Sequence, residues 1–117
     1  MNSLVLMMSK QPCVYILASQ PNGTLYTGVT SNLVQRVYQH RTNAVDGFTK
    51  QHKAHDLVWS EIHEIIESAI RREKQIKNWS RKAKINLIEK HNLAWRDLWL
   101  ELTSPSMAPG FRQSLPE

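Results

Sequence analysis

The sequence of 117 residues contains a single cysteine, Cys13, so an intramolecular disulfide is impossible and no oxidising compartment is implied. A long hydrophobic run is also missing. The apolar stretch from Leu4 to Met8 is too short for a membrane span or a signal-peptide core, and no basic segment or small-residue cleavage site frames it. We therefore expect a cytoplasmic protein.

Several signatures of catalytic chemistry are absent as well. The sequence has no glycine-rich phosphate loop, no nucleophile elbow and no Cys/His nucleophile arrangement. Neither a cysteine pair nor a second histidine pair stands at zinc-finger spacing, so we interpret His52 and His55, in a polar segment, as solvent-exposed side chains. A zinc site is therefore not predicted.

What is present is a composition typical of one folded, basic domain. Hydrophobic residues make up 41% and charged residues 21% of the chain, which favours a packed core over a disordered chain. The 15 lysines and arginines exceed the 10 aspartates and glutamates, which gives a formal net charge of +5. This excess favours polyanionic partners, with nucleic acid as the first candidate and an anionic membrane surface as the second.

The hydrophobic pattern predicts an α+β domain. Two β-prone segments, at 13–18 and 25–29, flank the turn signal Pro21-Asn22-Gly23 and predict a β-hairpin. A third strand is expected over 57–62, after a polar loop at 46–56. Helices are predicted from a cap at Thr30 or Ser31 to a point before Gly47, over 65–79, over 81–91 with Ser80 before it and Asn92 after it, and around Trp95, Leu98, Trp99 and Leu102.

These segments define the expected architecture and its boundaries. Two strands, a helix, a strand and then helices favour a small antiparallel three-stranded sheet with helices packed against it. We expect this domain to cover 12–102 of the chain. A flexible N-terminus at 1–11 and a disordered tail at 103–117, rich in proline, serine and glycine, would flank it.

Glu73 is the most informative single residue for function. At helical spacing it falls in the middle of an apolar face, so its carboxylate is directed toward the core. A buried carboxylate must be ion-paired, hydrogen-bonded or bound to a metal, or it must lie where the apolar face opens into a cleft. The residues that make up this face are Ile65, Ile66, Ala69, Ile70 and Ile76.

Arg36 and His40 form a second group of interest. They stand one helical turn apart, on the flank of an apolar face made by Leu33, Val34, Val37 and Tyr38. An arginine there is suited to hold a phosphate, because its planar fork offers several donors and keeps its charge. Solvated surface charge is the alternative interpretation of this pair.

A third feature is a cluster of cations around Trp79. Basic residues with an interspersed aromatic are typical of a surface that follows a nucleic-acid backbone, although an ordinary solvated helix face has the same composition. Two further lysines, Lys50 and Lys53, lie in the polar loop and are included in the predicted DNA-binding set. The helical members of that set are Arg71, Arg72, Lys74, Lys77, Arg81, Lys82 and Lys84.

Taken in order, these residues resemble the GIY-YIG nuclease superfamily and, within it, the small stand-alone UPF0213 group. The similarity extends from about Pro12 to Trp99. Two departures are Cys13-Val14 where the first motif is named for glycine and isoleucine, and Thr27 in the middle of the second motif. The segments that carry the resemblance are CVYIL at 13–17, LYTGVT at 25–30, LVQRVYQH at 33–40, GFT at 47–49 and REKQIKNW at 72–79.

The resemblance implies roles for six catalytic positions. Tyr15 and Tyr26 correspond to the tyrosines of the two motifs, Arg36 to the catalytic arginine, and His40 to the residue one turn beyond it. Glu73 corresponds to the metal-binding glutamate, holding one Mg²⁺ or Mn²⁺ ion. The late asparagine of the family is assigned to Asn92, with Asn86 as the alternative.

The implied activity is divalent-metal-dependent hydrolysis of DNA phosphodiester bonds. Tyr15 would activate the attacking water, directly or with His40, while Tyr26 and Arg36 hold the phosphate; the alternative assigns the two tyrosines the opposite roles. Single-stranded or branched DNA is the expected substrate, because bases could stack on Trp59, Trp79 or Trp95 where these are exposed. A non-catalytic nucleic-acid-binding module on the same fold is the alternative, and a membrane-surface protein a third.

Overall fold

The structure is a computed structural model that describes residues 11–42 and 54–103. Its elements confirm the α+β class and the three-stranded antiparallel sheet with helices packed against it. The expected N-terminal segment, the C-terminal tail and most of the loop at 46–56 lie outside the described residues. In chain order the elements are β1 (Cys13–Ala18), β2 (Leu25–Thr30), α2 (Leu33–Arg41), β3 (Asp56–Ile62), α4 (Ile66–Lys77), α5 (Arg81–His91) and α6 (Trp99–Thr103).

The sheet has the order β2-β1-β3, with β1 antiparallel to both neighbours. Every residue of β1 is buried, which agrees with its uninterrupted apolar sequence. The predicted hairpin between β1 and β2 is confirmed. Its turn contains Asn22 in the left-handed region (φ 59°), and the Gly23 N–H donates to the Gln20 carbonyl at 2.9 Å.

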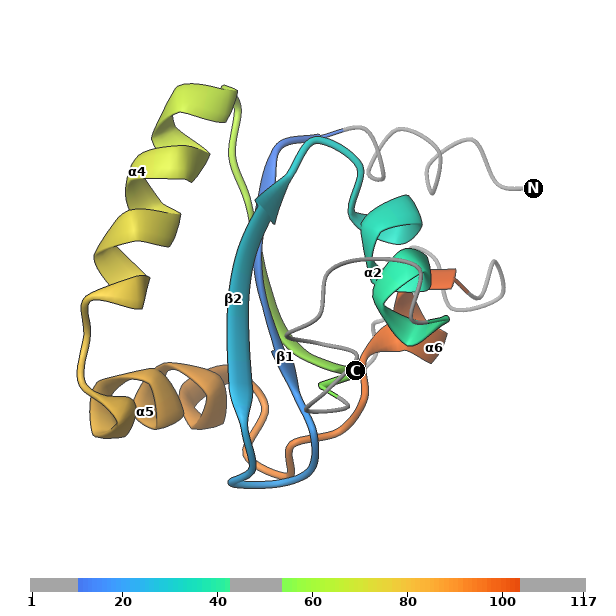
Figure 1. Cartoon of the computed structure of the whole chain (residues 1–117), viewed down its shortest axis with the longest axis vertical. Coiled ribbons are helices and arrows are strands. Elements are labelled where there is room, and N and C mark those ends of the chain that lie inside the picture. The colour runs from blue at the N-terminus through green and yellow to red at the C-terminus, as the bar shows by residue number, and fades with distance from the viewer. Residues whose placement is uncertain (1–10, 43–53, 104–117) are drawn as a thin grey trace.

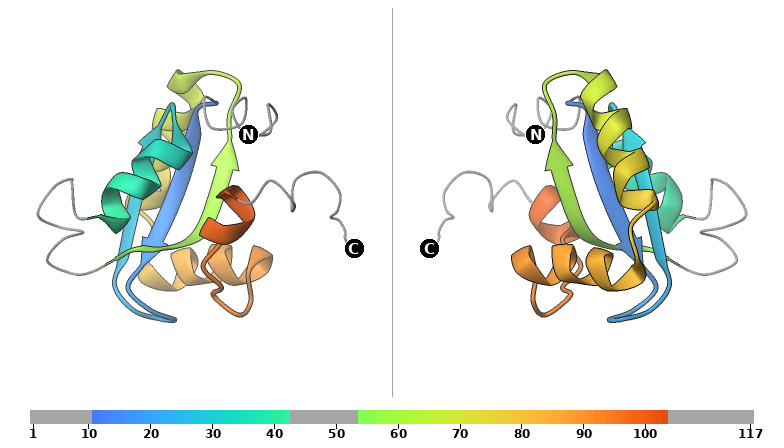
Figure 2. Two further views of the ribbon diagram at one scale, coloured as in Figure 1. Left: turned by 90° about the vertical axis from the view of Figure 1, so that its right-hand side faces the viewer. Right: turned by 90° about the vertical axis from the view of Figure 1, so that its left-hand side faces the viewer.

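Helices cover both faces of the sheet, as Figures 1 and 2 show. The side of α4 and α5 is called the α4 face, and the side of α2 and α6 the α2 face. Because side chains alternate along a strand, β1 contributes Val14, Ile16 and Ala18 to the core of the α4 face. The same strand contributes Cys13, Tyr15 and Leu17 to the core of the α2 face.

A bulge in β3 supplies an extra side chain to the α4 face. Ile16 lies opposite Trp59, but the next residue, Leu17, lies opposite Leu57, so Val58 is the additional residue. Val58 and Trp59 consequently both join the core of the α4 face, while Leu57 belongs to the α2 face.

Helix α2 differs in detail from its prediction. Its N-cap is Asn32, not Thr30 or Ser31, because the Asn32 side-chain oxygen accepts a hydrogen bond from the Gln35 N–H at 3.1 Å. The buried stripe consists of Leu33, Val37 and His40. Tyr38 lies about 100° further round the helix than Val37 and is 59% exposed, so its placement in the apolar face was wrong.

Helix α4 also buries a narrower stripe than the sequence predicts. Ala69, Glu73 and Ile76 are its buried residues. The three other isoleucines of the expected face lie at or near the beginning of the helix, where Figure 1 shows α4 extending beyond the ends of the strands. With no sheet beneath them they remain exposed: Ile65 at 55%, Ile66 at 36% and Ile70 at 36%.

The C-terminal part closes the domain. Ser80 caps α5, its hydroxyl accepting from the Ala83 N–H at 3.1 Å, and Asn92 ends that helix, both as predicted. Trp95, expected in the closing helix, instead precedes α6, with φ 58°, and is buried with its indole N–H donating to Glu89 at 2.7 Å. Within 11–42 and 54–103 no helix has the length and apolar character needed to cross a membrane.

Candidate active site

Two tyrosines and a histidine meet on the α2 face. The Tyr15 hydroxyl lies 3.0 Å from His40 Nε2, within hydrogen-bonding distance. The centroids of the Tyr15 and Tyr26 rings are 6.3 Å apart, and the imidazole of His40 lies 5.9 Å from the first and 5.1 Å from the second. Strands β1 and β2 and helix α2 therefore each contribute one ring to a single cluster, referred to here as the tyrosine cluster.

Gly28 makes room for this cluster. It lies directly opposite Tyr15 in the β1–β2 pairing. A Cβ atom on Gly28 would stand 2.5 Å from both Cζ and the hydroxyl oxygen of Tyr15. The absence of a side chain therefore allows the Tyr15 ring to lie across β2.

The members of the tyrosine cluster differ in their access to solvent. Tyr15 and His40 are each only 1% exposed, whereas Tyr26 is half-buried. A buried hydroxyl and a buried imidazole nitrogen require hydrogen-bonding partners, and the contact between Tyr15 and His40 meets that requirement for both. Of the three rings, Tyr26 is therefore the most exposed to solvent.

Arg36 borders the tyrosine cluster on the β2 side. Arg41, on the same helix, faces β3 and α6, since it donates to Asp97 at 2.6 Å and its guanidinium lies 5.2 Å from the ring centroid of Trp99. Arg36 is about 140° away from Arg41 around the helix axis and is exposed. Its side chain therefore leaves α2 on the flank toward edge strand β2, one turn before His40.

Glu73 occupies the corresponding flank of α4. On one side of that helix Arg72 reaches β3, where its Nε donates to Glu61 at 3.0 Å. Glu73 lies about 100° from Arg72, on the side toward β2. Its side chain is nearly buried, and its carboxylate pairs with the Lys77 ammonium at 2.6 Å. Helices α4 and α2 lie on opposite faces of the sheet (Figure 1). From the helix geometry above, Glu73 and Arg36 each stand on the β2 flank of their helix.

The donor set at Glu73 suits a weakly held hard cation more than a closed metal site. No group of three or more His, Cys, Asp or Glu side chains that could enclose a metal is found in the ranges 11–42 and 54–103. A single carboxylate that already holds an ammonium group nevertheless fits Mg²⁺, which keeps most of its ligands as water and substrate oxygens.

The two candidate asparagines have different surroundings. Asn92 is 5% exposed, and its amide donates to the carbonyls of Val58 at 3.1 Å and Arg96 at 2.8 Å, while its side-chain oxygen accepts from the Arg96 N–H at 3.0 Å. These contacts tie the end of α5 to β3, so Asn92 has a structural explanation. Asn86 is exposed on α5.

The basic residues also divide into two groups. Arg72 is bound to Glu61, and Arg81 donates to the carbonyls of Asn22 and Gly23 at 2.6 and 2.7 Å, which fastens α5 to the hairpin turn. The remaining helical members are exposed, except for the half-buried Lys84. Lys50 and Lys53 lie outside the described residues. Lys77 is exposed but pairs with Glu73, and the other exposed cations of this set are Arg71, Lys74 and Lys82.

Two polar networks have no signature in the sequence. Asp97 accepts from Arg41 and from the Leu57 N–H at 3.1 Å, joining α2, β3 and the start of α6. On the other face His63 bridges Glu61 and Ser68, with 2.8 Å to each. Both networks join residues far apart in sequence or across a turn, where periodicity carries no information.

The single cysteine, Cys13, is chemically inert, because burial raises the pKa of its thiol to about 11.

Comparisons with known proteins identify the family of this chain. A family model described as the GIY-YIG catalytic domain matches residues 11–86. A UPF0213 protein of Staphylococcus haemolyticus strain JCSC1435 is 37% identical over 76 residues, which is 65% of this chain and 92% of the relative. A UPF0213 protein of Staphylococcus aureus strain Mu3 is 34% identical over the same shares of both chains. A solution NMR structure of a UPF0213 protein from Bacillus halodurans has a TM-score of 0.49 and 26% identity, over 77% of this chain and 95% of that one.

The family match defines the class of this protein: the chain belongs to the GIY-YIG family and contains a GIY-YIG catalytic domain. The hairpin contributes two tyrosines to this domain, and α2 contributes an arginine and a histidine. Within that family it groups with the UPF0213 proteins. The GIY-YIG domain is the domain of a nuclease family whose members act on DNA and generally use divalent metal ions.

Proposed function

We propose that this protein is a divalent-metal-dependent endonuclease that hydrolyses DNA phosphodiester bonds at the β2 edge of its sheet, with single-stranded or branched DNA as its preferred substrate. The observation that carries the proposal is the contact between the Tyr15 hydroxyl and His40 Nε2, next to the ring of Tyr26. It supplies a hydroxyl and an imidazole nitrogen within hydrogen-bonding distance, which is the arrangement needed for acid–base chemistry.

Tyr15 and His40 can together take a proton from the attacking water. A neutral tyrosine accepts a proton only if it gives up its own, and its hydroxyl is within reach of His40 Nε2. The water proton passes to the Tyr15 oxygen while the Tyr15 proton passes to His40, and the hydroxide forms the new bond to phosphorus. The bond to the leaving oxygen breaks, and that oxygen takes a proton from solvent. Because Tyr26 is more exposed, it can share or exchange the contact with water.

Arg36 and Tyr26 provide the contacts for the phosphate itself. Arg36 is exposed on the β2 flank of α2, and its planar fork can hold two phosphate oxygens. The Tyr26 hydroxyl can donate to a third. These donors stabilise the charge that builds up on the phosphate as hydroxide attacks.

Glu73 is the residue proposed to hold one Mg²⁺ or Mn²⁺ ion. Bound there, the ion would neutralise phosphate charge as a Lewis acid. The chain's own contribution is the position of the carboxylate: it is nearly buried, on the β2 side of α4, and pairs with a half-exposed lysine that can move aside. In the absence of DNA, Lys77 stabilises the otherwise costly carboxylate.

Of the three tryptophans considered for stacking on bases, one is accessible. Trp59 and Trp95 are only 3% and 5% exposed, so they are core residues and cannot stack on bases. Trp79 is half-buried and remains a candidate. A site at a sheet edge bordered by two helices also favours a flexible strand, which can follow the edge more closely than a stiff duplex.

Cleavage assays on labelled single-stranded, forked and duplex DNA test the proposal. We expect cutting with Mg²⁺ or Mn²⁺, none in EDTA, and faster cutting of the single-stranded and forked substrates. Glu73→Gln and Arg36→Ala should each abolish most activity. Glu67→Gln, on the exposed side of the same helix, and Arg96→Ala, an exposed arginine paired with Glu101, are the matched controls and should cut normally.

Each alternative predicts a different result. DNA binding without cleavage under both metals would favour the non-catalytic binding module. Near wild-type cleavage by Glu73→Gln or Arg36→Ala would show that the assigned site is wrong. Equal cutting of the three substrates would refute the preference for single-stranded or branched DNA but leave the nuclease assignment intact.

A further inference from the structure

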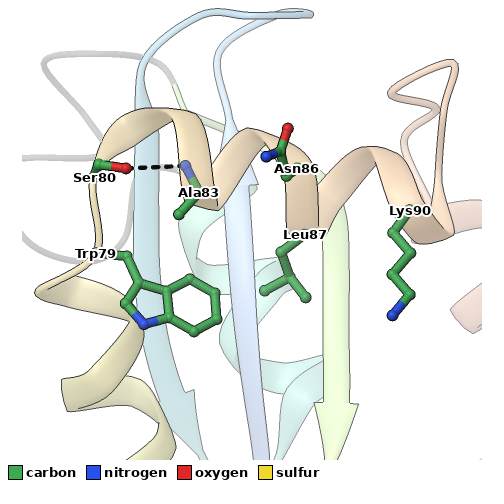
Figure 3. A pocket seen from close by; sticks show the side chains of 6 residues that line it. All are labelled: Trp79, Ser80, Ala83, Asn86, Leu87 and Lys90. Atoms are coloured by element: carbon green, nitrogen blue, oxygen red, sulfur yellow. Dashed lines mark hydrogen bonds between the residues drawn. The ribbon is translucent and has the colours of Figure 1, made fainter.

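A hollow of about 380 Å³ lies along α5, on the side of the molecule away from the tyrosine cluster. Its volume falls within the range of small-molecule sites, about 300–1,000 Å³. The proposed catalytic chemistry makes no use of it. The residues that line it, referred to together as the α5 hollow, are Trp79, Ser80, Ala83, Asn86, Leu87 and Lys90 (Figure 3).

The wall of the α5 hollow is apolar and includes an aromatic ring in a fixed position. In Figure 3 the side chains of Trp79 and Leu87 extend to the same side of α5. Both pack against the core of the α4 face. The Arg72 guanidinium lies 5.3 Å from the Trp79 ring centroid and is itself held by Glu61 at 3.0 Å. Core packing and the Arg72 guanidinium thus hold the indole in a fixed position, which preorganises it for a flat ligand.

The rim of the α5 hollow is cationic. Lys90 is exposed and extends to the same side as Leu87 in Figure 3. A second hollow, of about 290 Å³, is lined by Thr24, Leu25, Arg81 and Lys84. Leu25 begins β2, the strand that carries Tyr26, so positive charge continues from the proposed catalytic edge to α5. A polyanion leaving that edge would therefore meet Arg81 and Lys84 before it reaches the α5 hollow.

We propose that the α5 hollow binds one unstacked base of single-stranded DNA, with the base against Trp79 and Leu87 and a neighbouring phosphate near Lys90. An aromatic face beside positive charge is the combination by which proteins hold single strands without regard to sequence. Bases inside a duplex are stacked and cannot enter. The inference rests on the proposed nuclease function and would explain its preference for single strands.

The test measures binding in EDTA, so that cleavage does not interfere. A fluorescent oligothymidine and an abasic oligonucleotide of the same length carry the same phosphates but differ in their bases. We expect the full chain to bind the oligothymidine at least about fivefold more tightly, since stacking one base contributes about 1–3 kcal/mol. An equal affinity for both would overturn the proposal.

Two variants assign the difference to the α5 hollow. Trp79→Ala removes the stacking surface, and Ala83→Leu fills the space with a good helix former. Each variant should lower the affinity for the oligothymidine and leave the affinity for the abasic oligonucleotide unchanged, so that the two affinities become similar. Lys90→Ala should weaken both oligonucleotides more than Lys82→Ala, an exposed lysine on the same helix that does not line the hollow. Circular dichroism checks folding, and Ala83→Leu keeps the test valid if Trp79→Ala unfolds.

The remaining outcomes also decide the question. If Ala83→Leu leaves the preference for bases intact, the hollow is not the site. If Ala83→Leu instead changes the oligomeric state on gel filtration, the hollow is an interface between copies and the proposal falls. Failure of the nuclease proposal is distinguishable, because the wild type would then bind oligothymidine in EDTA but leave it uncut when Mg²⁺ is added.

Discussion

The two faces of the sheet are equally buried but chemically different. Strand β1 serves both, and each of its residues is at most 1% exposed. On the α4 face its side chains are aliphatic, Val14, Ile16 and Ala18, and they pack against aliphatic and tryptophan side chains. On the α2 face, Tyr15 stands among the apolar residues, and its hydroxyl is met by His40 from α2.

The tyrosine cluster lies on one face of the sheet, and most of the purely apolar packing lies on the other. Burying a hydroxyl or an imidazole costs free energy unless each finds a partner, so a face built for stability alone would use aliphatic side chains. The α2 face buries polar groups where they meet each other, whereas the core of the α4 face is apolar and Glu73 is buried at its β2 side. Substitutions on the two faces should therefore separate activity from stability.

Tyr15→Phe should have the largest effect. It removes one oxygen from the α2 face and with it the proposed proton path to His40. Acid–base catalysis contributes about 10²–10⁴-fold, so we expect the rate of single-stranded DNA cleavage to fall by about that factor. The free energy of unfolding should change by only about 1 kcal/mol, the typical net value of one hydrogen bond.

Tyr38→Phe is the matched control for this variant. Tyr38 lies on α2 but is 59% exposed, so the same chemical change there should leave both cleavage and stability unaltered. Cleavage by Tyr15→Phe within a factor of a few of wild type would contradict the assignment of the contact between Tyr15 and His40 to catalysis.

Ile76→Ala tests the opposite face. Ile76 is fully buried in the core of the α4 face, and a cavity there should lower the free energy of unfolding by about 2–5 kcal/mol. Chemical denaturation measures the loss. Ile76 shares its helix with Glu73 but contributes no polar group to the proposed site, so cleavage per folded molecule should fall far less than in Tyr15→Phe.

Ile70→Ala is the control on the same helix. Ile70 is 36% exposed, so its truncation should cost clearly less. A large loss of activity per folded molecule in Ile76→Ala would show that the packing of α4 also positions Glu73 or the tyrosine cluster, and that stability and activity are not separable on this face.

Gly28→Ala should affect both properties at once. The new methyl group would stand 2.5 Å from the Tyr15 hydroxyl oxygen, so the ring must move and its contact with His40 is disturbed. Overpacking of this kind costs about 1–3 kcal/mol of stability. Cleavage should fall as well. In the Tyr15→Phe background the further loss of activity from Gly28→Ala should be much smaller, because the contact is already gone; additive losses would contradict this account.

Much of this comparison was predictable from the sequence. The strands and the succession of helices follow from periodicity and turn signals, and the ends of α5 from the capping preferences of Ser80 and Asn92. That Glu73 is buried follows from its place on a helical face, and the structure confirms it. The family motifs predicted that Tyr15, Tyr26 and His40 belong to one site, and in the structure their rings lie next to one another.

Other features were not predictable because they depend on tertiary placement. Periodicity could not show that the beginning of α4 extends past the sheet, which leaves Ile65 and Ile66 exposed. Nor could it show that Arg72 and Arg81, two of the predicted DNA-binding cations, are held by Glu61 and by the hairpin turn. Such pairings are set by where elements dock, and no local pattern records them.

Asp56→Asn should give the smallest effect, with the opposite sign. Asp56 opens β3, and burial raises its pKa above 3.8, with a further contribution from the charge of Asp97 and a partial offset from Arg41 and His55. The folded protein thus binds this proton more tightly than the unfolded chain. The stability it contributes is fully present below pH 3.8 and is lost as the pH rises through the higher folded value.

At neutral pH the Asp56 carboxylate therefore opposes folding, and the uncharged amide should increase stability by about 0.5 kcal/mol, the scale of changes outside the core. The gain should fade as the pH falls below 3.8, where the aspartate is protonated in both states. Denaturation curves at neutral and acid pH measure it. Asp97→Asn is the informative counterpart: Asp97 accepts from Arg41 at 2.6 Å and from the Leu57 N–H at 3.1 Å, so its neutralisation should destabilise the protein. If both substitutions destabilised the protein at neutral pH, the Asp56 carboxylate would favour folding through Arg41, and burial and the charge of Asp97 would not dominate its environment.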